Sequence, residues 1–162
     1  MTRAPGVLVR AARNGMGLFA TRRYRRGERI LDVPGRIYNH RVLWNRGGTF
    51  ADNCYRFGPE TYLDPGDGVA RYVNHSCEPN AAVGKERNRL YLFAAAPIAN
   101  GDEIVFDYST ILGDDDIWTM RCNCGEARCR KRIKRFGALP ADVRERYLDE
   151  GLVPRFIIDT LR

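Results

Sequence analysis

The stretch Arg71-Tyr72-Val73-Asn74-His75-Ser76-Cys77-Glu78-Pro79-Asn80 is the part of the sequence that most constrains the fold and the site. The amide of Asn74 both donates and accepts hydrogen bonds, so it suits a ligand that carries an amine and a carboxylate. An isolated Asn-His pair, by contrast, more often caps a turn. Cys77 lies three residues further on and becomes a metal ligand once its thiol is deprotonated. The stretch therefore predicts a polar binding site beside a metal site.

Four of the five cysteines are spaced for metal binding. The segment Cys122-Asn123-Cys124-Gly125-Glu126-Ala127-Arg128-Cys129 holds three of them. The first two are too close for an easy disulfide, yet both thiolates can turn toward one ion, and Gly125 lets the backbone fold tightly around it. A structural zinc takes four ligands, so a fourth must come from elsewhere. Cys77 is the natural candidate, and His75 and Cys54 are alternatives.

A zinc ion bound by Cys77, Cys122, Cys124 and Cys129 would hold the segment after residue 120 onto the earlier part of the chain. This is a role in folding, since the ligands come from distant parts of the sequence. Cys54 is then left over, and we expect it to be a buried core thiol.

Length and composition indicate one domain. The chain has 162 residues, of which 44% are hydrophobic and 29% are charged, as is typical of a soluble protein. No apolar run approaches the ~20 residues that cross a membrane, and the first residues, 1–5, lack the apolar region of a signal peptide. We therefore expect a monomer with no membrane contact in a reducing intracellular compartment, the cytoplasm or, in a eukaryotic cell, the nucleus.

The net charge is +7, which bears on partners and solubility rather than on fold. Its ordinary explanation is a solvated basic surface, and the sharper one is a nucleic acid or another acidic partner. The sharper one is weakly favoured by a run of cations: Arg128, Arg130, Lys131, Arg132, Lys134 and Arg135.

Short apolar stretches between turn residues predict many short strands. The predicted strands are residues 6–11, 28–33, 89–94 and 102–107. After Ala138 the pattern changes, and Pro140 can begin a helix that runs to about Glu150 and stops at Gly151. Residues 154–161 predict a second short helix. The fold class is therefore mainly β with a short helical tail.

Four segments, in this order, resemble the SET-domain methyltransferases. The first is Gly15-Met16-Gly17-Leu18-Phe19-Ala20, which looks like the family's glycine-rich turn, and the second is the stretch 71–80 quoted above. The third is Gly101-Asp102-Glu103-Ile104-Val105-Phe106-Asp107-Tyr108, and the fourth is the cysteine segment, which is similar to the module called post-SET. Together they cover about residues 6 to 133. The resemblance implies a fold of small sheets with a pseudoknot. It also implies a SET domain over residues 1–120, a post-SET zinc knuckle over 121–136 and a C-terminal helical extension over 137–162.

The same resemblance implies transfer of methyl groups from S-adenosylmethionine to a lysine of a protein or peptide. It assigns three groups of residues. The cofactor-binding residues are Gly15, Met16, Gly17, Leu18, Phe19, Arg71, Asn74 and His75, the last through its backbone. The catalytic residues are Tyr108, Phe106 and Tyr55, and the zinc ligands are Cys77, Cys122, Cys124 and Cys129.

The reaction needs a neutral amine, although free lysine has a pKa of about 10.4. A narrow apolar channel lowers that pKa, and most of the acceleration comes from holding amine and methyl in line. Tyr108 is expected to orient the amine. Phe106 occupies a position that is Tyr or Phe in the family, and Phe leaves room for a methylated amine, so di- or trimethyl-lysine is the expected product. The family often has a further Tyr where this chain has Val33, and Tyr38 could replace it.

Two other functions are consistent with the sequence. One is a zinc-stabilised basic module that binds nucleic acid or protein without catalysis, although such a module has no need of Tyr108, Asn74 and His75. The other is methylation of a small amine, which a tail that closes the channel would favour. Asp114-Asp115-Asp116, between the catalytic motif and the knuckle, is expected either to attract a cationic substrate at the channel rim or to form a solvated turn.

Overall fold

Short strands make up most of the computed structural model, which describes residues 3–42 and 52–161. The strands are β1 (Arg3–Ala4), β2 (Val7–Ala12), β3 (Gly15–Ala20), β4 (Arg29–Val33), β5 (Arg36–Asn39), β6 (Tyr55–Gly58), β7 (Thr61–Asp64), β8 (Asn74–His75), β9 (Ala81–Glu86), β10 (Arg89–Ala94), β11 (Val105–Phe106), β12 (Met120–Arg121) and β13 (Arg132–Ile133). The helical elements are the 3₁₀ turns η1 (Val69–Tyr72), η2 (Tyr108–Ile111) and η3 (Phe136–Ala138), with α3 (Ala141–Asp149) and α4 (Arg155–Ile158). The expectation of a mainly β chain with a short helical tail is confirmed.

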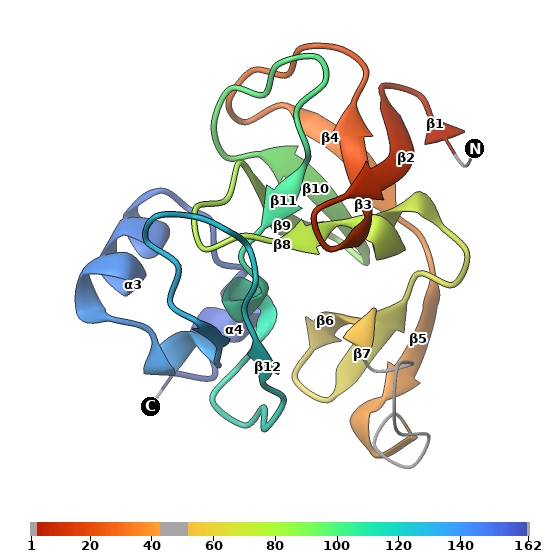
Figure 1. Ribbon diagram of the computed structural model, residues 1–162. Coiled ribbons are helices and arrows are strands. Elements are labelled where there is room, and N and C mark those ends of the chain that lie inside the picture. Colours follow the sequence, from red (N-terminus) through yellow and green to blue (C-terminus); the bar gives the residue numbers. More distant parts are fainter. Residues whose placement is uncertain (1–2, 43–51, 162) are drawn as a thin grey trace.

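The strands form small separate sheets (Figure 1). The three-stranded sheets have the orders β1-β2-β3, β4-β10-β9 and β5-β7-β6. Two further pairs join β12 to β13 antiparallel and β8 to β11 parallel. A parallel pair needs a long connection, and here the connection between β8 and β11 contains β9 and β10. The pairing therefore brings residues about thirty positions apart into contact, and the site lies there.

The strand expected at residues 102–107 is shorter than predicted, because only Val105–Phe106 pairs as a strand. Asp102 instead forms a turn in which its carboxylate accepts a hydrogen bond from Ala99 N at 2.9 Å. The segment expected as a glycine-rich turn, 15–20, is strand β3 for its whole length. The turn precedes it, at residues 13–14, and Gly15 enters β3 with a φ of +79°, a conformation that costs glycine little.

The main core lies between the sheets. Leu90 and Leu92 of β10 are 0% exposed, while Tyr91 and Phe93 on the other face of the strand are half-buried. Both faces of this strand are therefore at least partly buried. The guanidinium of Arg29 lies 4.0 Å from the centre of the Tyr91 ring and covers part of that outer face.

The tail packs on the strand-rich body through a second apolar cluster. Val143 and Tyr147 share the buried face of α3, because residues four positions apart lie on the same face of a helix. They meet Ala82 of β9 and Ala95 in this cluster. Gly151 follows α3 with a φ of +68°, as expected of a residue that ends a helix. Among the described helices, none is long and apolar enough to cross a membrane.

A buried arginine ties the loop before the metal segment to the β5-β7-β6 sheet. The side chain of Arg56 is 2% exposed and forms ion pairs with Asp116 at 2.6 Å and with Asp115 at 2.9 Å. Tyr62 donates a hydrogen bond to the other oxygen of Asp116. Asp114 lies 3.6 Å from Arg135. All three aspartates therefore have cationic partners within the protein, but Asp115 keeps a side chain that is 59% exposed and Asp116 lines the aromatic cavity described below, so both expectations for this stretch stay predictions.

Replacing Arg56 with methionine is expected to lower the free energy of unfolding by about 3–5 kcal/mol, because Asp116 would be left buried without its counter-charge. Urea unfolding measures the loss. The matched control is Arg36→Met, at an exposed arginine of the same sheet. The combined variant Arg56→Met/Asp115→Asn/Asp116→Asn should regain part of the loss. A loss below about 1 kcal/mol in the single variant would contradict this account.

Candidate functional site

The β8–β11 pair separates two cavities. In this pair Val105 lies opposite Asn74 and Phe106 lies opposite His75. Successive side chains of a strand point to opposite faces, and accordingly Val105 lines a polar cavity while Phe106 lines an aromatic one. The two cavities therefore share this two-stranded wall.

The aromatic cavity has about 710 Å³ of empty space, part of it open to solvent. Phe106 forms its floor: the Phe106 ring stacks on Tyr55 with centroids 5.7 Å apart and lies 4.9 Å from Tyr108. Trp118 adds a fourth ring, 6.4 Å from Tyr108. The cavity thus brings together the three predicted catalytic residues, Tyr108, Phe106 and Tyr55.

The two tyrosine hydroxyls of this cavity are held by backbone carbonyls. Tyr108 Oη donates to Val73 O at 2.7 Å, and Tyr55 Oη donates to Ala70 O at 2.6 Å. Burial raises the pKa of both tyrosines above the ordinary value. Both hydroxyls therefore stay protonated and neutral at physiological pH, and each keeps lone pairs that can accept a hydrogen bond from an amine. The rings around these hydroxyls exclude water from an amine that enters the cavity, which favours its uncharged form.

Asn74 and Glu103 form the centre of the polar cavity, which has about 660 Å³ of partly open space. The Asn74 amide donates one proton to the backbone oxygen of Met16 at 3.1 Å and the other to Glu103 Oε1 at 2.8 Å. Both amide protons are therefore in use, so Asn74 can offer a ligand only its carbonyl oxygen, which is an acceptor. Asn74 was expected to bind either the amine or the carboxylate of a ligand, and its free acceptor now favours the amine.

The charges around the polar cavity suit a ligand with two positive groups and one carboxylate. The lining carboxylates are Glu78, Asp102, Glu103 and Glu126. Arg13 lines the same cavity and supplies a positively charged guanidinium group. A sulfonium and an ammonium fit beside the carboxylates, and an α-carboxylate fits beside the arginine, so S-adenosylmethionine is compatible with these residues.

His75 joins the polar cavity to the cysteine cluster. It is 7% exposed, and burial lowers its pKa to about 4, so the ring is neutral. Its Nδ1 accepts a hydrogen bond from the backbone N–H of Tyr108 at 3.1 Å. The proton is therefore on Nε2, which lies 3.4 Å from Cys77 Sγ. His75 thus supports a neighbouring sulfur and positions the turn that carries Tyr108.

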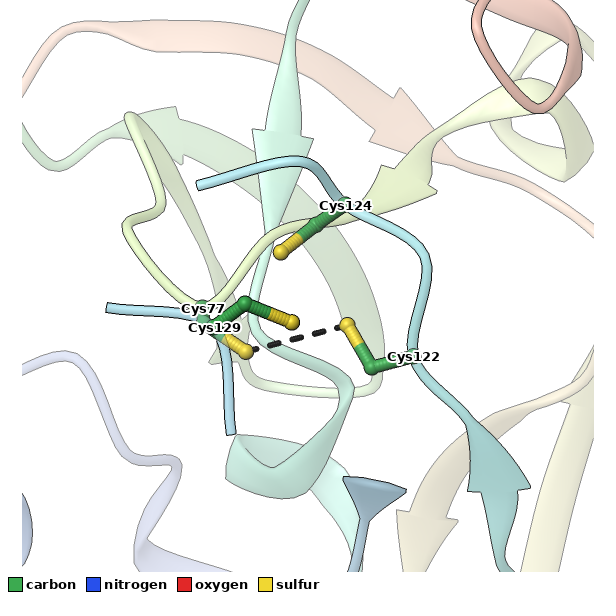
Figure 2. Close-up of side chains that lie close together, drawn as sticks. All are labelled: Cys77, Cys122, Cys124 and Cys129. Carbon is green, nitrogen blue, oxygen red and sulfur yellow. Dashed lines mark hydrogen bonds between the residues drawn. The ribbon is translucent and has the colours of Figure 1, made fainter. Parts of the chain in front are cut away.

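Figure 2 shows the sulfurs of Cys77, Cys122, Cys124 and Cys129 turned toward one another, all within 4.8 Å. The Cys77 and Cys122 sulfurs are 3.8 Å apart, which matches the edge of about 3.8 Å expected for a tetrahedron with Zn–S bonds of about 2.3 Å. Burial opposes ionisation of Cys124, but N–H groups of Cys77 and Glu126 lower its pKa to about 7. The four residues therefore fit a structural zinc.

His75 and Cys54, the two alternative ligands, are not part of this group. In the described part of the chain, the group consists of the four thiols alone. Cys54 is half-buried, not fully buried as expected, and it lines the aromatic cavity. Burial raises the pKa of its thiol to about 12.

The cysteine loop, residues 122–129, contributes Cys124 and Glu126 to the lining of the polar cavity. Asn14 and Asn123 exchange two hydrogen bonds, each of 3.1 Å, between the β2–β3 turn and this loop. Ser76 donates to Glu126 at 3.1 Å. The φ of Gly125 is +83°, a conformation that favours glycine, and a Cβ there would also displace the end of the Arg13 side chain, 2.5 Å away. Metal binding and the shape of the polar cavity are therefore coupled.

Asp107 connects the catalytic turn to both later segments. Its side chain is fully buried and accepts hydrogen bonds from Ser109 N at 3.0 Å, Arg130 Nη2 at 2.5 Å and Tyr147 Oη at 2.9 Å. Arg130 directly follows the cysteine loop, and Tyr147 lies in α3. Asp107 is not among the residues predicted from the sequence, although its place beside Tyr108 in the quoted motif was the available signal. Trp118 and Glu103 were not predicted either.

The other predicted cofactor residues lie in different surroundings. Leu18 and Phe19 are buried in β3, at 0% and 8% exposure. Met16 contributes its backbone oxygen to Asn74, and a Cβ at Gly17 would lie 2.4 Å from Glu103 Oε1. Gly17 therefore allows β3 to approach the Asn74–Glu103 pair.

Two positions bear on the aromatic cavity. Arg71 lines this cavity and not the polar one. Val33 occupies the position where the family often has a tyrosine. It is buried in β4 opposite Leu90 and does not line the aromatic cavity. Tyr38 lies on β5 opposite Tyr62.

Comparison with known proteins agrees with this geometry. The model of the SET domain family matches residues 15–109. "Histone-lysine N-methyltransferase 2B" of Homo sapiens is 33% identical over 137 residues, which cover 76% of this chain and 5% of that protein. "Putative histone-lysine N-methyltransferase ASHH4" of Arabidopsis thaliana is 27% identical over 159 residues, 91% of this chain and 44% of that protein. The chain thus spans less than half of either relative.

Solved structures share the fold. A crystal structure of KRYPTONITE in complex with mCHH DNA, H3(1-15) peptide and SAH has a TM-score of 0.60 and 26% identity, covering 79% of this chain and 29% of that one. The methyltransferase domain of human histone-lysine N-methyltransferase SETMAR has a TM-score of 0.63 and 23% identity, covering 76% and 55%.

Proposed function

Because this chain belongs to the SET domain family, we propose that it transfers methyl groups from S-adenosylmethionine to a lysine side chain of a protein. The observation that carries the proposal is the shared wall: β8 and β11 contribute Asn74, His75 and Val105 to the polar cavity and Phe106 to the aromatic cavity. When bound in the polar cavity, the cofactor supplies a methyl group on a sulfonium. The Asn74 carbonyl oxygen would accept from its ammonium, and Arg13 would pair with its carboxylate.

The residues of the aromatic cavity prepare the lysine. The rings of Tyr55, Phe106, Tyr108 and Trp118 surround the side chain and favour the neutral amine by excluding water. The Tyr108 hydroxyl, fixed on Val73 O, accepts a hydrogen bond from that amine and aims its lone pair along the axis between the cavities. No residue of this chain acts as a nucleophile, since the amine itself attacks.

The aromatic cavity is open to a protein substrate rather than closed by the tail. No residue in the described tail, 137–161, lines it, which does not favour the small-amine alternative. We further propose the division into a SET domain (1–120), a zinc knuckle (121–136) and a helical extension (137–162), in a monomer. A reducing compartment, cytoplasmic or nuclear, would keep the four zinc-binding thiols reduced.

The direct test incubates zinc-loaded protein with methyl-labelled S-adenosylmethionine and either recombinant histone H3 or a whole-cell lysate. Mass spectrometry then locates the labelled residues. Label on lysine side chains supports the proposal. Protein that binds the cofactor by calorimetry yet labels no lysine in either sample would identify it instead as a non-catalytic module.

Asn74→Ala is expected to weaken cofactor binding by about 1–3 kcal/mol, because the cofactor's ammonium loses its acceptor. Calorimetric titration with S-adenosylhomocysteine measures the loss. Asn88→Ala, at an exposed asparagine of the β9–β10 turn, is the matched control and should bind as the wild type does. Equal affinities in the two variants would remove Asn74 from the site.

Phe106→Tyr is expected to stop the reaction at monomethyl-lysine. The wild type should proceed to di- or trimethyl-lysine, because the Phe106 ring leaves space in the aromatic cavity for a methylated amine. The added hydroxyl can hold a water in that space while leaving the first methylation rate within about an order of magnitude. A mass-spectrometric time course with removal of the product inhibitor decides the matter. Wild-type product that ends at monomethyl-lysine contradicts this role of Phe106.

A further inference from the structure

Nearly all of the net charge of the chain lies in one short segment. Residues 117–135 contain seven lysines and arginines and one carboxylate, Glu126, which is +6 out of the +7 of the whole chain. The segment includes the cysteine loop and the β12–β13 pair, which we call the zinc hairpin. The rest of the protein is close to neutral, so the high positive charge of this segment is not a general property of the chain.

Internal partners account for only some of these cations. Arg130 is paired with Asp107, Arg135 lies 3.6 Å from Asp114, and Arg128 lies 3.9 Å from Glu78. Four exposed cations remain that have no carboxylate within 4.0 Å in the described part of the chain: Arg121, Lys131, Arg132 and Lys134. We call these four the hairpin cations.

The zinc site does not neutralise the hairpin cations. Four thiolates around one Zn²⁺ carry a net charge of about −2, so a surplus of about four positive charges remains in the segment. The sulfurs also receive backbone N–H groups, from Arg130 to Cys77 and from Lys131 to Cys129, each at 3.4 Å. Part of the compensation of the thiolates therefore comes from the backbone and not from the exposed side chains.

The geometry of the hairpin keeps like charges together. Arg121 lies directly opposite Arg132 in the β12–β13 register, and both are exposed. Like charges in directly opposite positions destabilise a strand pair. This pair has two residues in each strand, so the cysteine cluster and the buried Ile133 must hold it. The arrangement costs stability in the free protein and gains it when an anion lies across the pair.

We propose that the hairpin cations form a docking surface for the phosphate backbone of a nucleic acid. Two of the four are arginines, whose planar guanidinium groups bind phosphate through two hydrogen bonds. A nucleic acid duplex presents one negative charge per ~1.7 Å of its axis. This dense row of charges suits four exposed cations between residues 121 and 134 better than the scattered carboxylates of an acidic protein do. An acidic protein is the competing partner, and the experiment separates the two.

The surface also has a place relative to the site. Trp118, three residues before Arg121, lines the aromatic cavity. Nucleic acid on the hairpin would lie beside the entrance for the lysine, so proteins bound to nucleic acid would be the favoured substrates. This last step rests on the proposed function, whereas the docking surface does not.

The experiment measures binding to fluorescently labelled duplex DNA and single-stranded RNA by anisotropy over a series of salt concentrations. In Arg121→Gln/Arg132→Gln/Lys134→Gln, the affinity for duplex DNA should fall at least tenfold at low salt. The slope of log K against log salt should become shallower by about 2.7, since each lost phosphate contact removes ~0.9. Zinc content and melting temperature establish that this variant is folded.

Two controls make the test specific. Arg23→Gln/Arg25→Gln/Arg89→Gln removes the same charge from exposed positions outside the zinc hairpin and should bind nearly as the wild type does. Arg121→Lys/Arg132→Lys preserves the charge and should keep the salt slope even if the glutamine variant is unstable. The proposal is overturned if the wild type does not bind, if both charge-removal variants lose affinity equally, or if poly-glutamate of equal charge competes as well as DNA. Methylation of a free peptide, measured separately, tests the proposed function alone.

Discussion

Tyr108→Phe is expected to lower the rate of methyl transfer by at least ~10²-fold, an order typical of losing one well-placed polar group. The variant keeps the ring, and therefore its packing against Phe106, His75 and Trp118. It loses only the hydroxyl, which rests on Val73 O. The free energy of unfolding should fall by no more than about 1.5 kcal/mol, the value of one hydrogen bond. The variant should therefore lose most of its methyl-transfer rate while keeping nearly all of its stability.

The measurement is the single-turnover rate with labelled S-adenosylmethionine, together with urea unfolding and cofactor affinity. The matched control is Tyr91→Phe, which removes a hydroxyl from the outer face of β10 and should leave the rate unchanged. If Tyr108→Phe retained more than about a tenth of the wild-type rate, the hydroxyl would not position the amine, and the aromatic cavity would act by shape alone.

Removing zinc is expected to unfold the cysteine loop and to abolish cofactor binding. Structural zinc ions contribute apparent binding free energies of about 10–16 kcal/mol in zinc-finger peptides, far more than the loop can supply from its few apolar contacts. Because Asn123 and Glu126 of this loop pair with Asn14 and Ser76 across the polar cavity, the loss of metal should open that cavity. Binding and stability should therefore fall together.

Three readouts test this without any activity measurement. Metal analysis should give one zinc per chain, a chelator should lower the melting temperature, and calorimetry should show that S-adenosylhomocysteine no longer binds. Cys122→Ser should reproduce the effect of the chelator, whereas Cys54→Ser should retain the zinc. Full zinc content in Cys77→Ser would exclude Cys77 as a ligand and would contradict the four-thiol site.

Several predictions could be made from local sequence because the chemistry they depend on is local. Helix α3 follows from Pro140 at its start, Gly151 at its end and an apolar i, i+4 pair between them. Strands β2, β4 and β10 follow from short apolar stretches between turns. Segment 15–20 was expected to be a turn because it looks like the family's glycine-rich turn, whereas pairing with β2 makes it a strand.

The acidic stretch 114–116 shows the limit of reading charge from sequence. Three consecutive aspartates look solvent-exposed, and nothing nearby in the chain contradicts this. Arg56, some sixty positions earlier, enters the core through β6 and pairs with two of them. A buried ion pair forms only when the fold brings both charges out of water together, so neither partner reveals it alone.

Taken by itself, the sequence determined the mainly β class, the helical tail and the four-cysteine set, because spacing along the chain encodes each of these. Resemblance to the SET-domain motifs added Asn74, His75, Phe106 and Tyr108 as candidate site residues. The tertiary structure alone decided which cavity each residue lines. It also revealed that both amide protons of Asn74 are in use, that Arg71 lies on the aromatic side, and that Asp107 joins the catalytic turn to Arg130 and Tyr147. Such contacts join residues that lie 23 to 58 positions apart. They are set by how several small sheets pack together, and no local pattern in the chain records that packing.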